Sequence, residues 1–267
     1  MSDFLRQMAA SSAERAAAVP ALRSADLDRP LAPLVADGFD VIAEIKNRSP
    51  AEGALAGPDS DRLARAQVYA RAGAAAISVL TEPTRFDGSL AHLEEVAAAV
   101  PGTPVMRKDF LVDPVQVDEA RAAGASGVLL IVAMLDDTGL RAMLDRSLEL
   151  GMFVLLEAFD REDLVRMRRL LAPADLDAAS SGRLLFGVNS RNLRTLAVDA
   201  DRLGDFVADL PRGPRVAESG LATAEDAERV ARYGYSMALV GTALMRSADP
   251  AGLIGAMRSA GMSGIAA

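Results

Sequence analysis

The stretch Val-Ile-Ala-Glu-Ile-Lys-Asn-Arg-Ser-Pro-Ala-Glu-Gly, residues 41–53, decides between two ways of arranging parallel strands. It begins as an apolar run with the length of a buried strand and then reaches two charged residues, Glu44 and Lys46. In an open, doubly wound sheet the turn after the first strand would have the pattern Gly-x-Gly-x-x-Gly. Residues 48–53 are Arg-Ser-Pro-Ala-Glu-Gly instead. This turn favours a closed barrel over the open sheet.

The alternation of strand and helix continues along the chain. Short apolar runs followed by longer stretches of helical period are typical of parallel strands joined by crossover helices. Strands are predicted at 41–45, 75–80, 104–106, 127–132, 153–156, 184–188, 215–217 and 237–240. Helices are predicted at 60–71, 89–100, 114–123, 137–150, 161–171, 199–208, 224–233 and 250–257. Eight such units predict an α/β fold, a (β/α)8 TIM barrel. We expect one domain over 1–267, in which a helical extension, 1–39, caps the barrel.

Glycine and hydroxyl residues mark several helix ends. Gly73, Gly124, Gly151 and Gly234 each follow a predicted helix and precede the next strand, as a C′ glycine does. Near the N-terminus, Ser11-x-x-Glu14 has the spacing of a capping box and predicts a helix start there.

Composition excludes several classes of protein. Hydrophobic residues make up 51% of the 267 residues, which is enough for a sizeable core, and the formal net charge is −8. The acidic balance argues against nucleic acid or an anionic membrane as a partner. No apolar run approaches the ~18 residues of a membrane helix, and the N-terminus lacks a signal-peptide pattern. Because the chain has no cysteine and no cluster with metal-ligand spacing, we predict no metal and a cytoplasmic protein.

Ionisable and amide side chains accumulate at the carboxyl ends of five predicted strands. Strands in a parallel barrel are buried, so such residues need a reason, and catalytic groups lie at the carboxyl rim of barrel enzymes. A single pair such as Glu44 with Lys46 is also explained as an ion pair that shapes the barrel. Five strand ends together predict a reaction site. The residues are Glu44, Lys46, Arg107, Lys108, Asp109, Glu157, Asn189, Arg191 and Glu218.

Only two of the 29 cationic side chains are lysines, Lys46 and Lys108, and both lie at strand ends. Arginine cannot replace an ammonium that must be compact or must give up its proton. We expect burial and neighbouring cations to lower a lysine pKa towards the range of a general acid.

The last two strands are followed by glycines, Gly220 and Gly241, and a short helix is predicted at 242–245. Loops in these positions, with the N-terminus of a short extra helix, form the common phosphate site of barrels. We therefore predict a phosphorylated small-molecule ligand.

Taken together, these motifs resemble the indole-3-glycerol phosphate synthase family. The similar segments follow the family's order between about residues 10 and 257, at 41–50, 78–83, 108–110, 129–131, 156–157, 188–193, 217–220 and 239–245. The resemblance implies a barrel enzyme of tryptophan biosynthesis. It would convert 1-(2-carboxyphenylamino)-1-deoxyribulose 5-phosphate to indole-3-glycerol phosphate with release of CO2 and water, without a metal or an organic cofactor.

The resemblance also implies a role for each matching residue. Lys108 would be the general acid at the C2′ oxygen and Glu157 the general base. Glu44 and Lys46 would both help to transfer protons and to balance charge. The substrate-binding set would be Ser49, Phe110, Leu130, Asn189, Arg191, Glu218 and Ser219. The phosphate-binding set would be Lys46, Gly220, Gly241 and Thr242.

Three residues depart from the usual family pattern. Asn47 replaces a basic residue, Ala51 a small hydroxyl residue, and Phe159 a His or Asn. Two alternatives stay open: a paralogue that accepts a ring-modified anthranilate adduct, and a phosphate-binding barrel without catalysis. A sugar-phosphate isomerase on the same barrel would leave the lysines unexplained. We expect a monomer or a weak homodimer.

Overall fold

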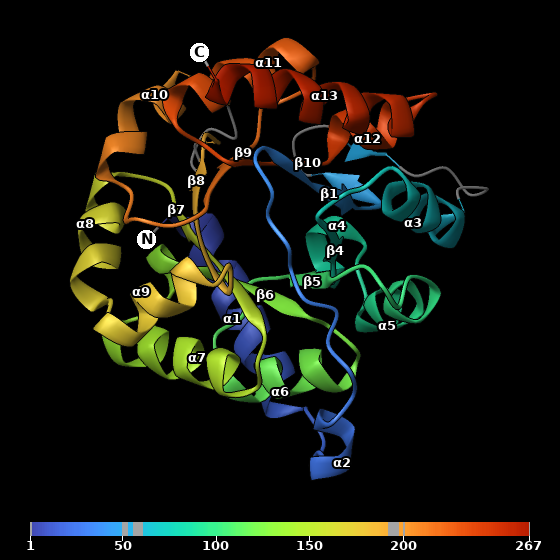
Figure 1. Ribbon diagram of the computed structural model, residues 1–267. Coiled ribbons are helices and arrows are strands. Elements are labelled where there is room, and N and C mark those ends of the chain that lie inside the picture. Colours follow the sequence, from blue (N-terminus) through green and yellow to red (C-terminus); the bar gives the residue numbers. More distant parts are fainter. Residues whose placement is uncertain (1, 50–52, 56–60, 192–197, 200, 267) are drawn as a thin grey trace.

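Eight parallel strands close into a barrel, which confirms the predicted fold (Figure 1). The computed structural model describes residues 2–49, 53–55, 61–191, 198–199 and 201–266. Each barrel strand pairs with its neighbours along the chain, and the last strand closes the barrel on the first, with Met237 opposite Asp40. The strands are β1 (Asp40–Ile45), β4 (Ala76–Leu80), β5 (Val105–Lys108), β6 (Gly127–Ile131), β7 (Phe153–Ala158), β8 (Leu184–Asn189), β9 (Arg215–Glu218) and β10 (Met237–Val240). A small hairpin of β2 (Arg48–Ser49) and β3 (Gly53–Ala54) lies in the loop after β1.

Helices alternate with the strands and surround the barrel (Figure 1). They are α3 (Arg62–Arg71), α4 (Pro83–Phe86), α5 (Leu90–Ala99), α6 (Pro114–Ala122), α7 (Asp137–Glu149), α8 (Arg161–Leu170), α9 (Pro173–Ser180), α10 (Arg202–Phe206), α11 (Ala224–Tyr233), α12 (Thr242–Arg246) and α13 (Pro250–Ile265), with 3-10 turns at Val132–Met134 and Val207–Asp209. None of the helices in the described part of the chain is long and apolar enough to cross a membrane.

Two helices differ from the prediction. The last helix continues to Ile265 because Ile254, Met257, Gly261 and Gly264 keep a buried face beyond the predicted end. Helix α9 is absent from the prediction, although Pro173 stands in its first turn and Asp175 caps it. Asp175 accepts a hydrogen bond from the backbone N–H of Ala172 at 2.7 Å and pairs with Arg141 of α7 at 2.6 Å.

The N-terminal extension contains α1 (Asp3–Ala17) and α2 (Ser24–Leu27). The predicted capping box at Ser11 is wrong, because Ser11 lies inside α1 and the cap is Ser2, whose side chain accepts the N–H of Leu5. The helix starts earlier because the buried face already begins at Leu5 and recurs at Met8. The C′ glycines are confirmed: Gly73, Gly124, Gly151 and Gly234 all have a positive φ.

Helix α1 is joined to the loop after β5 by a buried ion pair. Both guanidinium nitrogens Nη1 and Nη2 of Arg15 bind the carboxylate of Asp109, at 2.7 and 2.8 Å. Asp109 also accepts hydrogen bonds from the Thr81 hydroxyl at 2.6 Å and the Phe110 N–H at 2.8 Å. Since Asp109 lies between Lys108 and Phe110 in the chain, this pair holds the backbone that carries both.

We predict that Arg15→Ala lowers the free energy of unfolding by about 2 kcal/mol, because it leaves a buried carboxylate without its bidentate partner while Arg107 still offsets part of the charge. Urea unfolding measures this difference. The matched control is Arg23→Ala, which removes an exposed pair with Asp26 and is expected to leave the free energy of unfolding nearly unchanged. Equal effects of the two substitutions would contradict the prediction.

Candidate active site

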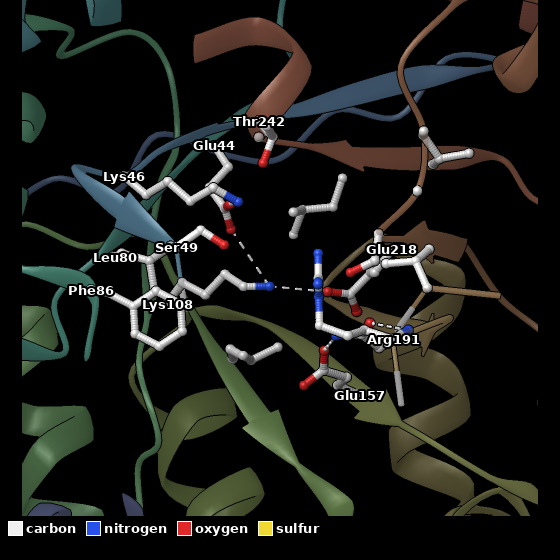
Figure 2. A pocket seen from close by; sticks show the side chains of 18 of the residues that line it. Glu44, Lys46, Ser49, Leu80, Phe86, Lys108, Glu157, Arg191, Glu218 and Thr242 are labelled. Atoms are coloured by element: carbon white, nitrogen blue, oxygen red, sulfur yellow. Dashed lines mark hydrogen bonds and ion pairs between the residues drawn. The ribbon is translucent and has the colours of Figure 1, made fainter. Parts of the chain in front are cut away.

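Charged side chains from four strands meet at one end of the barrel (Figure 2). Lys108 Nζ lies 3.2 Å from Glu218 Oε2 and 3.7 Å from Glu44 Oε2. Lys46 Nζ lies 2.7 Å from Glu44 Oε1, so Glu44 contacts both lysines of the chain. On the far side from Glu44, Glu157 Oε1 accepts a hydrogen bond from Asn189 Nδ2 at 2.7 Å. These groups line one cavity of about 510 Å³.

The strand register explains why these side chains converge. Residues two apart on a strand point to the same face, which places both Glu44 and Lys46 on the cavity side of β1. Asn189 is opposite Glu218 in the β8–β9 ladder. Gly241, after β10, leaves space for the pair on β1: a Cβ there would overlap Glu44 Oε1 and lie 2.9 Å from Lys46 Nζ.

Lys108 is surrounded by carboxylates. Burial alone would lower its pKa, but the charges of Glu218, Glu44 and Glu157 outweigh burial and raise the pKa above its ordinary value. The expectation of a lowered lysine pKa is therefore wrong for Lys108, because the groups that face it are anions and not cations. At neutral pH Lys108 is an ammonium.

The three carboxyl groups differ in their protonation. Burial, and then the charge of Glu218, raises the pKa of Glu157 to about 8, although Lys108 partly opposes this. Burial likewise raises the pKa of Glu218. Burial would raise the pKa of Glu44 too, but Lys46 and Lys108 lower it below its usual value. Glu44 is thus charged, while Glu157 is mostly protonated and partly ionised near neutral pH, and groups whose pKa values are separated in this way can act as acid and base.

One wall of the cavity is apolar and aromatic. The Phe110 ring lies 5.7 Å from the Phe4 ring in an edge-on contact and 6.1 Å from the Phe86 ring, centroid to centroid. Figure 2 shows Phe86 and Leu80 on the same side of the cavity as the start of the Lys108 side chain. No motif in the sequence marks Phe4 or Phe86, which join the cavity only through α1 and α4.

Leu130 does not line this cavity, contrary to the prediction. It is fully buried, while its neighbours Leu129 and Ile131 line the cavity. Successive side chains of a strand point to opposite faces, so the residue chosen from the motif is one position out of register.

The loops after β9 and β10 also contribute to the lining of the cavity. Ser219, Gly220, Gly241 and Thr242 line it, as does Lys46. Ser219 and Gly220 both have a positive φ, 67° and 74°, which is a costly conformation for a serine and is typical of functional sites. Apart from Leu130 and Arg107, the structure brings every predicted site residue to this one cavity, Ser49 and Arg191 included. Arg107 points away from the cavity and binds Glu119 of α6.

The three departures from the family pattern lie in different places. Phe159 lines the cavity. Asn47 donates a hydrogen bond to the backbone oxygen of Asp87 at 2.9 Å, which joins the loop after β1 to the loop after β4. Ala51 lies outside the described residues.

A closed (β/α)8 barrel with ion-paired acid and base groups at the carboxyl ends of its strands defines a barrel enzyme that transfers protons. Comparison with known proteins identifies the family. The family model described as "Indole-3-glycerol phosphate synthase" matches residues 12–257. The chain belongs to the indole-3-glycerol phosphate synthase family.

Individual relatives agree with this assignment. A protein from Nocardioides sp. named indole-3-glycerol phosphate synthase is 47% identical over 254 residues, 93% of this chain and 90% of that protein. One of the same name from Mycobacterium leprae is 41% identical, over 97% of this chain and 90% of that protein. Among solved structures, 3-hexulose-6-phosphate synthase from Salmonella typhimurium is similar with a TM-score of 0.63 at 15% identity, covering 85% of this chain and 100% of that chain; this likeness shows the fold alone.

We predict that Glu157 makes the stability of the fold depend on pH. A carboxyl whose pKa rises from 4.5 to about 8 on folding stabilises the folded state fully at low pH, and this contribution is lost as the pH rises through about 8. Glu157→Gln cannot titrate, so the free energy of unfolding of this variant should fall less than that of the wild type between about pH 5 and 8.

Urea unfolding at a series of pH values tests this expectation. Asp163, whose pKa burial raises to about 6, is present in both proteins and cancels in the difference. Glu94→Gln, on the exposed face of α5, is the control and should keep the wild-type pH dependence. Parallel pH curves for Glu157→Gln and the wild type would refute the prediction.

Proposed function

We propose that this protein converts 1-(2-carboxyphenylamino)-1-deoxyribulose 5-phosphate to indole-3-glycerol phosphate, with release of CO2 and water, in tryptophan biosynthesis. The observation that carries the proposal is the position of Lys108. Its ammonium is held between Glu44 and Glu218, with Glu157 near it, in a cavity lined by aromatic rings and by the glycine loops after β9 and β10. The substrate has three parts that match these features of the cavity. Its aromatic ring matches the aromatic side chains, its reacting carbonyl matches the ammonium of Lys108, and its phosphate matches the glycine loops.

Binding uses two parts of the cavity lining. The anthranilate ring packs against Phe110, whose orientation is supported by Phe4 and Phe86. The phosphate binds at Thr242, Gly220 and Gly241, which line the cavity, and Lys46 adds a positive charge. Contacts to the phosphate are remote from the reacting carbons, so their binding energy can be used to orient the carbonyl at Lys108.

The chemistry requires one acid and one base. The ring carbon that bears the carboxylate attacks the C2′ carbonyl, and Lys108 stabilises the developing negative charge on the oxygen and donates a proton to it. Loss of CO2 restores the aromatic ring, and the C2′ hydroxyl leaves as water after a second protonation. A proton must also be removed to form the indole double bond, and we assign this step to Glu157.

The pKa of Glu157, about 8, suits this role. A group that is partly ionised near neutral pH can accept a proton in one step and release it in another. Glu44, which stays ionised between the two lysines, keeps Lys108 charged and fixes its position. Asn189 orients Glu157 through its amide N–H.

Steady-state turnover of the standard substrate, followed by indole fluorescence, tests the activity. We predict saturable turnover by the wild type without added metal. Tight binding without turnover would leave a phosphate-binding barrel without catalysis. A ring-substituted adduct with a kcat/KM about ten-fold above that of the standard substrate, a preference of about 1.4 kcal/mol, would instead indicate the paralogue.

We predict that Lys108→Arg folds but lowers kcat by about 100-fold or more. The planar guanidinium keeps the charge, yet it is larger than the ammonium that fits between Glu44 and Glu218 and does not release a proton. The matched control is Arg71→Lys on the exposed surface of α3, which should keep the wild-type kcat. Near-wild-type turnover by Lys108→Arg would contradict the acid role.

A further inference from the structure

Gly187 lies in the middle of β8, where a glycine is unfavourable for a strand. Its backbone does not require glycine, because Gly187 is not among the glycines with a positive φ in the described part of the chain. The remaining reason for a glycine in a strand is that another group approaches the backbone closely.

The group that approaches is a carboxylate of the site. A Cβ on Gly187 would overlap Glu218 Oε1 and lie 3.0 Å from Leu155 Cδ1. Gly187 is two residues before Asn189 on the same strand and therefore on the same face, below the cavity. It is paired with Glu157 in the β7–β8 ladder, so the position lies directly beside two of the three carboxyl groups.

The carboxylate of Glu218 is almost fully enclosed. Its side chain is 1% exposed, and Oε2 is occupied by Lys108 Nζ at 3.2 Å. Apart from Glu157, with which Glu218 can share a proton, no described residue is a hydrogen-bond partner of Oε1. The position of Glu218 Oε1 therefore depends on the space around it, and the missing side chain of Gly187 leaves that space.

We propose that Gly187 is a positioning residue for Glu218: the missing side chain at this strand position makes the space that holds Glu218 Oε1, and so keeps Oε2 on Lys108 Nζ and the carboxylate beside Glu157. For its effect on turnover this inference rests on the proposed function. The expected effect of Gly187 on the ionisation of Glu157 does not rest on the proposed function.

Gly187→Ala tests the proposal. Because the overlapping atom is the end of a flexible side chain, we expect the barrel to fold and Glu218 to rotate away from Lys108. A displacement of about 1 Å at such a site corresponds to a loss of about 100-fold in kcat. With Glu218 moved, Glu157 loses the neighbouring negative charge that raises its pKa, so the pH-dependent loss of stability moves to lower pH.

The matched control is Gly127→Ala at the start of β6. There a Cβ would lie 2.5 Å from the Phe153 ring, a similar crowding of a barrel strand at a position away from the carboxylates. This variant should lose some stability and keep both the wild-type kcat and the wild-type pH dependence of unfolding. If Gly127→Ala lowers kcat as much as Gly187→Ala does, general strain in the barrel explains both effects and the proposal fails.

A double-variant cycle keeps the test decisive if Gly187→Ala alone does not fold. In a Glu218→Ala background the overlap no longer exists, so adding Gly187→Ala should change the unfolding equilibrium constant by no more than about twofold. An unfolded or strongly destabilised double variant would overturn the proposal, because the contact with Leu155 would then be the cause. The proposal would also be overturned if Gly187→Ala kept the wild-type kcat and the wild-type pH dependence of unfolding.

The two proposals fail in different ways. Absence of turnover in the wild type would overturn the proposed function. The unfolding measurements on the three Gly187 and Glu218 variants would still decide whether Gly187 positions Glu218.

Discussion

The placement of one ammonium group between buried carboxylates determines how the site is built. Lys108 Nζ can stay charged in a largely buried position only because Glu44 and Glu218 lie within 3.7 Å of it. Those carboxylates in turn need space and partners: Lys46 and Gly241 for Glu44, and Gly187 for Glu218. The barrel supports all of them because parallel strands bring their carboxyl ends to one rim, where catalytic groups of distant origin can meet.

The residue next to Lys108 is also held by ion pairs. Asp109 follows Lys108 in the chain but points away from the cavity centre to Arg15, Arg107 and Thr81. Its partner Arg15 belongs to α1, which also brings Phe4 to the cavity wall. The N-terminal extension therefore supports the reaction site from two sides, through a bidentate ion pair behind Lys108 and an aromatic contact with Phe110.

Errors in the sequence-based expectations have a common physical origin. Leu130 was chosen from a motif, and the pleat of β6 turns it away from the cavity and turns Leu129 and Ile131 towards it. The pKa of Lys108 was expected to fall, and it rises because the groups across the barrel are anions. Helix α9 is held to α7 by an ion pair with Arg141, which is distant in sequence. Each case depends on a neighbour that is close in space and not along the chain.

Local periodicity and short motifs are enough to predict the eight strand–helix units, the glycines that end several helices, the importance of the two lysines and the family. The side chains that face the cavity, the carboxyl that is mostly protonated and the need for glycine at position 187 follow only from the three-dimensional arrangement. These properties arise from the distances between strands and from the burial and charge around each group. A pattern along the chain contains none of these quantities.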